Sequence, residues 1–177
     1  MNTLDIIATV AVSFSILLIV ILRLALWLHG RRRRRPVPDV LPPISIIKPL
    51  KGADPLLEEN LESFFHLDYP QYELLLGVVD ESDPAYEIAK RVVERHPNFP
   101  VSLTVGVEQV CLNPKVRLMA RVARDARHGI FLISDSNVKV PSDYLKDMAA
   151  SFALPNVGLV TTPFRATGGR TLSARSE

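Results

Sequence analysis

Short apolar runs alternate with amphipathic stretches along residues 44–160. Continuous runs of four to eight apolar residues indicate strands buried on both faces, whereas apolar positions recurring at helical spacing indicate helices. The expected strands are 44–47, 72–79, 101–105, 130–133 and 157–160, and the expected helices are 54–65, 85–95, 117–127 and 141–152. This alternation predicts an α/β fold, with a mostly parallel sheet covered by helices on both faces.

Residues 6–28 form a longer, mostly apolar stretch whose single charged residue is Arg23. About 20 apolar residues suffice to cross a bilayer. A cleaved signal peptide is the alternative, but its positive charge would precede the apolar run; here Asp5 precedes it and Arg31–Arg35 follow. We therefore expect one transmembrane anchor at 1–30, an Arg/Pro-rich linker at 31–43 and a cytosolic domain at 44–177.

The charge distribution, the single cysteine and the lack of a Gly-rich loop limit the partners and enzyme classes that fit this chain. The formal net charge is +2, and Arg31–Arg35 carry more than that excess, so the remainder is slightly acidic. A basic run beside an apolar segment favours anionic lipid over nucleic acid as its partner. The single Cys111 excludes an intramolecular disulfide. No Gly-rich phosphate loop occurs, which disfavours dinucleotide oxidoreductases and P-loop enzymes.

Acidic residues follow two of the expected strands. Asp80 follows 72–79 and Asp135 follows 130–133, so a parallel sheet would bring both to one edge, where such sheets bind ligands. Asp135 and Asn137 offer hard oxygen ligands for Mg²⁺ or Mn²⁺. Loop lysines expected at the same edge could offset phosphate charge: Lys48, Lys51 and Lys115. The alternatives are turn or capping roles for the acids and ordinary surface positions for the lysines.

Five ordered motifs resemble ceramide glucosyltransferases and the related bacterial hopanoid-biosynthesis-associated glycosyltransferases. They are IIKPLKGADP at 46–55, NLESFF at 60–65, LDYP at 67–70, NPKV at 113–116 and SDSNV at 134–138. The segment RATGG at 165–169 looks closer to the bacterial branch.

This resemblance implies an inverting, GT-A-like glycosyltransferase. Such an enzyme would transfer glucose or N-acetylglucosamine from a UDP-sugar to a lipid hydroxyl, of ceramide or a hopanoid, at the cytosolic membrane face, here of a bacterial inner membrane. By the resemblance, Asp80 contacts the nucleotide and Asp135 the metal-diphosphate, with Asn113 and Lys115 near the donor. Lys51 joins them as an expected donor-binding residue.

The chain also departs from the family pattern. The family's third Asp, which is the general base, and its later Arg-Trp motif are absent; Trp27 is the only tryptophan. We therefore expect no catalytic residue in this chain and interpret it as an N-terminal fragment, with the acceptor half missing. The alternative is a membrane-anchored binding module without catalysis. An Asp-nucleophile phosphatase is disfavoured because no Asp-x-Asp-x-Thr follows a strand.

Overall fold

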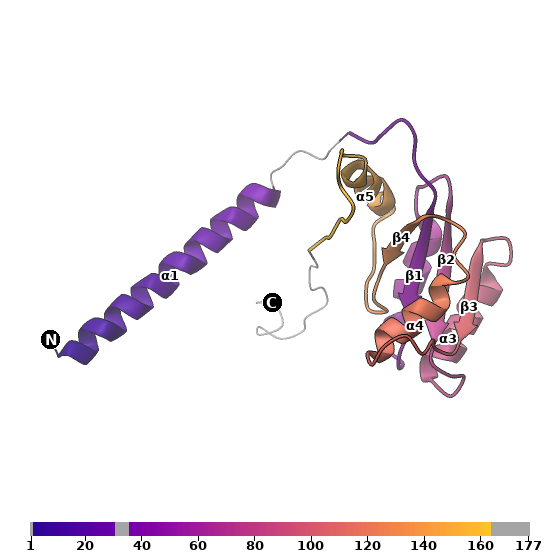
Figure 1. Cartoon of the computed structure of the whole chain (residues 1–177), viewed down its shortest axis with the longest axis horizontal. Helices are drawn as coiled ribbons and strands as arrows, with labels where there is room; N and C mark the ends of the chain where they lie inside the picture. Colours follow the sequence, from indigo (N-terminus) through magenta and orange to yellow (C-terminus); the bar gives the residue numbers. More distant parts are fainter. Residues whose placement is uncertain (1, 31–35, 164–177) are drawn as a thin grey trace. The chain divides into compact units, whose positions relative to one another are not determined.

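The computed structural model describes residues 2–30 and 36–163, and it divides the chain into two compact units, residues 1–35 and 36–177. The first unit is helix α1, Thr3–Gly30 (Figure 1). Its segment Thr3–Leu28 is long and apolar enough to cross a membrane, which agrees with the expected anchor helix. Arg31–Arg35 lie outside the described residues, so lipid binding by this run stays a prediction.

The second unit contains a four-stranded sheet in the order β3-β2-β1-β4. Its strands are β1 (Ile44–Pro49), β2 (Tyr72–Val78), β3 (Val101–Val105) and β4 (Ile130–Ile133). Every neighbouring pair is parallel, with β1 flanked by β2 and β4. The chain therefore builds outward from β1 to β3, then returns to the other side of β1. All four carboxyl ends face the same edge.

Three helices and a 3₁₀ turn connect the strands, and a fourth helix follows β4. They are α2 (Leu57–Glu62), which continues into the 3₁₀ turn η1 (Ser63–His66), α3 (Pro84–Arg95), α4 (Pro114–Ala123) and α5 (Tyr144–Phe152). Helix α3 begins where Asp83 accepts a hydrogen bond from the Ala85 N–H at 2.9 Å, with Pro84 in its first turn. An oxygen side chain before proline is a typical helix start.

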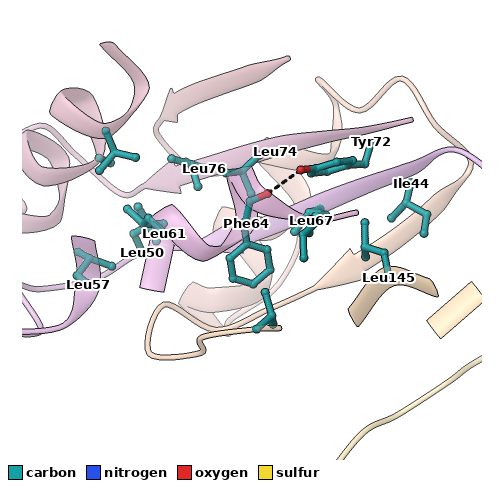
Figure 2. Packing of buried hydrophobic residues seen from close by; sticks show 14 of the residues in the cluster. Ile44, Leu50, Leu57, Leu61, Phe64, Leu67, Tyr72, Leu74, Leu76 and Leu145 are labelled. Atoms are coloured by element: carbon teal, nitrogen blue, oxygen red, sulfur yellow. Dashed lines mark hydrogen bonds between the residues drawn. The ribbon is translucent and has the colours of Figure 1, made fainter. Parts of the chain in front are cut away.

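The main core fills one face of the sheet. Alternate strand residues such as Ile46, Leu74 and Leu76 are fully buried there against α2, η1 and α3. Figure 2 shows Phe64 among these side chains, with its carbonyl accepting a hydrogen bond from the Tyr72 hydroxyl at 3.0 Å. Tyrosine therefore enters this core with its hydroxyl satisfied.

Helix α4 covers the other face over β1 and β2. Leu118 and Val122 pack there against Ile47 and Leu75. Gly77 lies directly beneath them: a Cβ at this position would stand 2.3 Å from Val122 Cγ2 and 3.1 Å from Leu118 Cδ1. The absence of a side chain at Gly77 is what lets α4 approach the sheet this closely. Helices on both faces confirm the predicted layer order.

One strand prediction was wrong, and another was wrong in part. Residues 157–160 form no strand. An apolar pocket of about 370 Å³ lies between this segment and β4, so their backbones do not pair. Strand β4 is also not buried on both faces: Phe131 and Ile133 are more than half exposed, because α4 covers β1 and β2 but does not extend over β4.

Several helix boundaries also differ from expectation: α4 ends at Ala123 instead of residue 127, and α5 begins at Tyr144 instead of residue 141. Asp54 does not cap α2 directly; its carboxylate accepts from the Leu56 N–H at 2.8 Å, and the helix begins later, at Leu57. Helix α4 begins at Pro114 instead of in the expected region near Arg117, because Asn113 caps it. Residues 113–116, which precede the expected helix 117–127, therefore form the start of α4.

Candidate functional site

A pocket of about 530 Å³ opens at the carboxyl edge of the sheet. Four segments line it: the loop after β1, the end of β2, the start of α4 and the turn after β4. The lining residues are Pro49, Leu50, Lys51, Asp54, Val79, Asn113, Pro114, Lys115, Leu118, Asp135, Ser136 and Asn137. The chain leaves β1 toward β2 and later returns to β4, so the pocket lies at the switch point where open α/β sheets bind ligands.

Asp135 stands on the turn that follows β4 and lines this pocket. Its carboxylate forms an ion pair with the Lys115 ammonium group, and both side chains are about half exposed. An ion pair this exposed contributes little free energy, about 0–1 kcal/mol. The Asp135 carboxylate can therefore exchange Lys115 for another cation at a small cost in free energy.

Asn137 lies two residues further along and is exposed in the same pocket. Among residues 2–30 and 36–163, no three His, Cys, Asp or Glu side chains are grouped as a metal cage. Mg²⁺ is commonly held by one or two carboxylates together with waters and substrate phosphates. The donor set at Asp135 and Asn137 fits such a phosphate-completed site and does not fit an all-protein cage.

Three further predicted residues line the pocket: Lys51, Asn113 and Lys115. The Asn113 side-chain oxygen accepts from the backbone N–H groups of Lys115 at 3.0 Å and Val116 at 3.4 Å. That oxygen is thus engaged as the N-cap of α4. The cap fixes the helix end that carries Lys115, so Asn113 shapes the site even though its acceptor is occupied.

Asp80, the other predicted acid, is at the same edge but is absent from the pocket lining. Its carboxylate accepts hydrogen bonds from the Ser82 hydroxyl and, at 2.9 Å, from the Ser82 N–H. The hydrogen bond from the Ser82 hydroxyl is the largest cause that lowers the pKa of Asp80 below its ordinary value, and the bond from the Ser82 N–H is the next. Asp80 is a fully exposed turn residue with an ionised carboxylate adjacent to the pocket residue Val79.

Lys48 was expected in a loop, and this was wrong. It belongs to β1 and is fully buried, because its side chain lies on the same face of the strand as Ile44 and Ile46, toward Phe64 in the main core. Its Nζ donates to the Asp135 carbonyl at 2.7 Å and to the Ser134 hydroxyl at 3.2 Å. Burial lowers the pKa of Lys48 to about 7, although the nearby Asp135 opposes the shift.

Sequence reasoning missed two residues that shape the pocket. Asp83 accepts from the Gly52 N–H at 2.8 Å and so ties the loop after β1 to the start of α3. Gly52 has φ +71°, a conformation that favours glycine. Asn60 donates to the Ser136 carbonyl at 3.4 Å. The Asp-Pro pair at 83–84 signals a cap, but nothing local signals the contact from Asn60.

The sequence of this chain is similar to those of enzymes that transfer sugars. A family model described as glycosyl transferase family 21 matches residues 8–177. Ceramide glucosyltransferase 1 of Caenorhabditis elegans is 39% identical over 122 residues, covering 68% of this chain and 26% of that protein. Ceramide glucosyltransferase 3 of the same organism is 40% identical over 126 residues, covering 70% and 28%. The chain spans about a quarter of the length of these curated relatives.

A solved structure shares the fold. The mannosyltransferase PcManGT from Pyrobaculum calidifontis, in complex with GDP-Man and Mn²⁺, superimposes with a TM-score of 0.66 and 26% identity. The match covers 86% of this chain and 44% of that one. The predicted GT-A-like fold class is confirmed.

Proposed function

The chain belongs to glycosyl transferase family 21, and on that premise we propose that it forms the donor-binding part of a membrane glycosyltransferase. The donor would be a UDP-sugar, bound at the carboxyl edge of the sheet. The observation that carries this proposal is the convergence of Lys51, Lys115 and Asp135 on one pocket at the switch point. That pairing of cations with a carboxylate suits a diphosphate with its metal ion.

The residues at the pocket would have different roles in binding the donor and its metal ion. Lys51 and Lys115 would neutralise phosphate charge, and α4, whose first turn lines the pocket, would direct the positive end of its dipole toward the same group. Asp135 and Asn137 would hold Mg²⁺ or Mn²⁺. When bound, that ion stabilises the negative charge that develops on the departing diphosphate. Asp80 would accept hydrogen bonds from the nucleoside beside Val79.

The acceptor side of the reaction is proposed from the relatives. Transfer to a lipid hydroxyl fits a chain whose helix α1 can span a membrane, with the pocket on the cytosolic face. The names of the curated relatives favour glucose and ceramide, whereas the RATGG segment, outside the described residues, favours N-acetylglucosamine and a hopanoid-type lipid in a bacterial inner membrane. No residue of 2–30 or 36–163 is assigned as the general base on that hydroxyl.

The test is Mn²⁺-dependent binding of UDP to the full chain in detergent micelles, measured by isothermal titration calorimetry. We expect binding that requires Mn²⁺ and falls by roughly 10-fold or more in Asp135→Asn, because a charged metal ligand is lost. Asp68→Asn is the matched control: Asp68 is another exposed carboxylate paired with a lysine, Lys146, but outside the pocket.

Absence of UDP binding at millimolar concentration with Mn²⁺ would refute the donor site. Equal losses in Asp135→Asn and Asp68→Asn would also refute it, because the effect would then be nonspecific. Lipid binding without any nucleotide affinity would favour the alternative of a non-catalytic binding module that acts through Arg31–Arg35.

A further inference from the structure

A lysine at position 48 is unfavourable in free energy because the side chain is buried. It is fully buried beneath the carboxyl edge of the sheet, and among residues 2–30 and 36–163 it forms no ion pair. Removing an ammonium group from water without a paired carboxylate is strongly unfavourable. A methionine or leucine would fill the same volume at no such cost. The contacts that Lys48 makes must therefore explain why this position holds a lysine.

Those contacts converge on one short segment, the turn 134–137. One N–H of Lys48 donates to the Asp135 carbonyl at 2.7 Å, and another donates to the Ser134 hydroxyl at 3.2 Å. The ammonium group also stands 4.0 Å from the centre of the Phe64 ring, which attracts a cation. Lys48 thus ties the residue that carries the pocket carboxylate to β1, the central strand.

The same turn has a second anchor from the α2–η1 segment. Asn60 is buried and donates to the Ser136 carbonyl at 3.4 Å. Four residues further along the chain, the Val140 N–H donates to the Ser63 hydroxyl at 3.2 Å. Lys48 and Asn60 belong to the sequence motifs 46–55 and 60–65, but neither side chain lines the pocket.

We propose that Lys48, assisted by Asn60, is a positioning residue: it fixes the turn 134–137 so that the Asp135 carboxylate points into the pocket at the geometry a divalent cation requires. This inference rests on the proposed donor site. Lys48 touches neither donor nor metal, since it does not line the pocket. It acts through the backbone carbonyl of Asp135, much as residues behind metal ligands orient them in other sites.

The proposal separates positioning from stabilisation. If Lys48 only supported the fold, Lys48→Met would lower the melting temperature. Positioning predicts that Lys48→Met folds with an undiminished melting temperature, since replacing buried charge with an apolar residue of similar volume is often neutral or stabilising. The loss would be confined to the turn, and metal affinity would fall.

The experiment compares the full wild-type chain, Lys48→Met and the control Lys146→Met in detergent micelles. Lys146 is another lysine whose partner, Asp68, lies outside the pocket. Hydrogen exchange would follow the Ser134 and Val138 amides, which donate to Ile47 and Asp135 carbonyls. Calorimetry would measure Mn²⁺ binding in the presence of UDP. We expect faster exchange at these amides and roughly 10- to 100-fold weaker Mn²⁺ binding in Lys48→Met alone.

Wild-type exchange at the turn in Lys48→Met, or Mn²⁺ affinity within about twofold of wild type, would overturn the proposal. If Lys48→Met does not fold, Asn60→Leu decides through the same two measurements, with a smaller loss expected from its longer hydrogen bond. If wild type binds no Mn²⁺ with UDP, the donor site fails, and the exchange comparison still decides whether Lys48 holds the turn.

Discussion

Gly77→Ala would test how closely α4 must approach the sheet. The added Cβ would lie 2.3 Å from Val122 Cγ2, whereas carbon atoms normally approach to about 3.5–4.0 Å. Relief therefore requires a movement of more than about 1 Å. Val122 cannot easily rotate away, because a β-branched residue in a helix has one strongly preferred rotamer. Leu118, at 3.1 Å, blocks a simple tilt.

The expected cost is that of overpacking a well-filled core, about 1–3 kcal/mol. For a domain of this size, that corresponds to a fall in melting temperature of roughly 4–12 °C. Thermal unfolding followed by circular dichroism would measure it. Because α4 carries Lys115 into the pocket, UDP binding should weaken as well.

Gly129→Ala is the matched control, since a Cβ there meets nothing within 4 Å. We expect it to melt within about 2 °C of wild type, as for a substitution that causes no clash. A Gly77→Ala protein as stable as wild type would show that α4 does not rest on the strand as described. A similar loss in Gly129→Ala would show that the effect comes from glycine replacement in general.

Two further predictions concern single side chains. Asn113→Ala should lower stability by about 0.5–2 kcal/mol, because α4 loses its N-cap, while Asn113→Ser should retain most of it; urea unfolding would measure both, and equal losses would contradict a capping role. The Lys48 pKa is about 7 when folded, below the ordinary 10.5, so between these values the unfolded chain binds the extra proton. The stability of wild type relative to Lys48→Met should therefore rise as pH increases from about 7 toward 10.5 and be lowest below 7, and a difference independent of pH across that window would refute the assignment.

Much of the sheet could be predicted from local pattern alone. The strand at 101–105 matches β3 residue for residue, and the apolar run at 130–133 matches β4. The run at 157–160 looked equally strand-like. What differed is tertiary: strand formation needs a hydrogen-bonding neighbour, and an apolar pocket intervenes between this run and β4. Likewise, a run of apolar residues cannot reveal that α4 stops short of Phe131.

The sequence predicted where the site lies better than it predicted the contacts of the individual residues. Strand-end chemistry placed Asp135, Lys51 and Lys115 at one edge, and they do line one pocket. Whether they bind donor and metal stays a prediction. Lys48 was misplaced because lysine before Pro49 resembles a loop, and only the register of β1 beside β2, which pairs Lys48 with the core residue Leu76, shows that it points inward. Buried polar side chains that serve a distant turn leave no periodic signal in a sequence.

The pairing of β1 with β4 has a consequence for how the molecule assembles. Ile44 pairs with Tyr72 across a short stretch of chain but with Ile130 across a stretch about three times as long. Closing the longer loop costs about 1 kcal/mol more in chain entropy. We therefore expect β1, β2 and β3 to associate first and β4 to dock last.

Until that last step, Lys48 lacks two of its partners, the Ser134 hydroxyl and the Asp135 carbonyl. During synthesis the donor pocket would thus be completed only after β4 has left the ribosome. Pulse-labelled hydrogen exchange during refolding should show protection at Leu75 before Leu132; the reverse order would contradict this sequence of events. Any ligand that contacts both Lys51 and Asp135 would also link β4, the last strand to dock, to β1, one of the first to form.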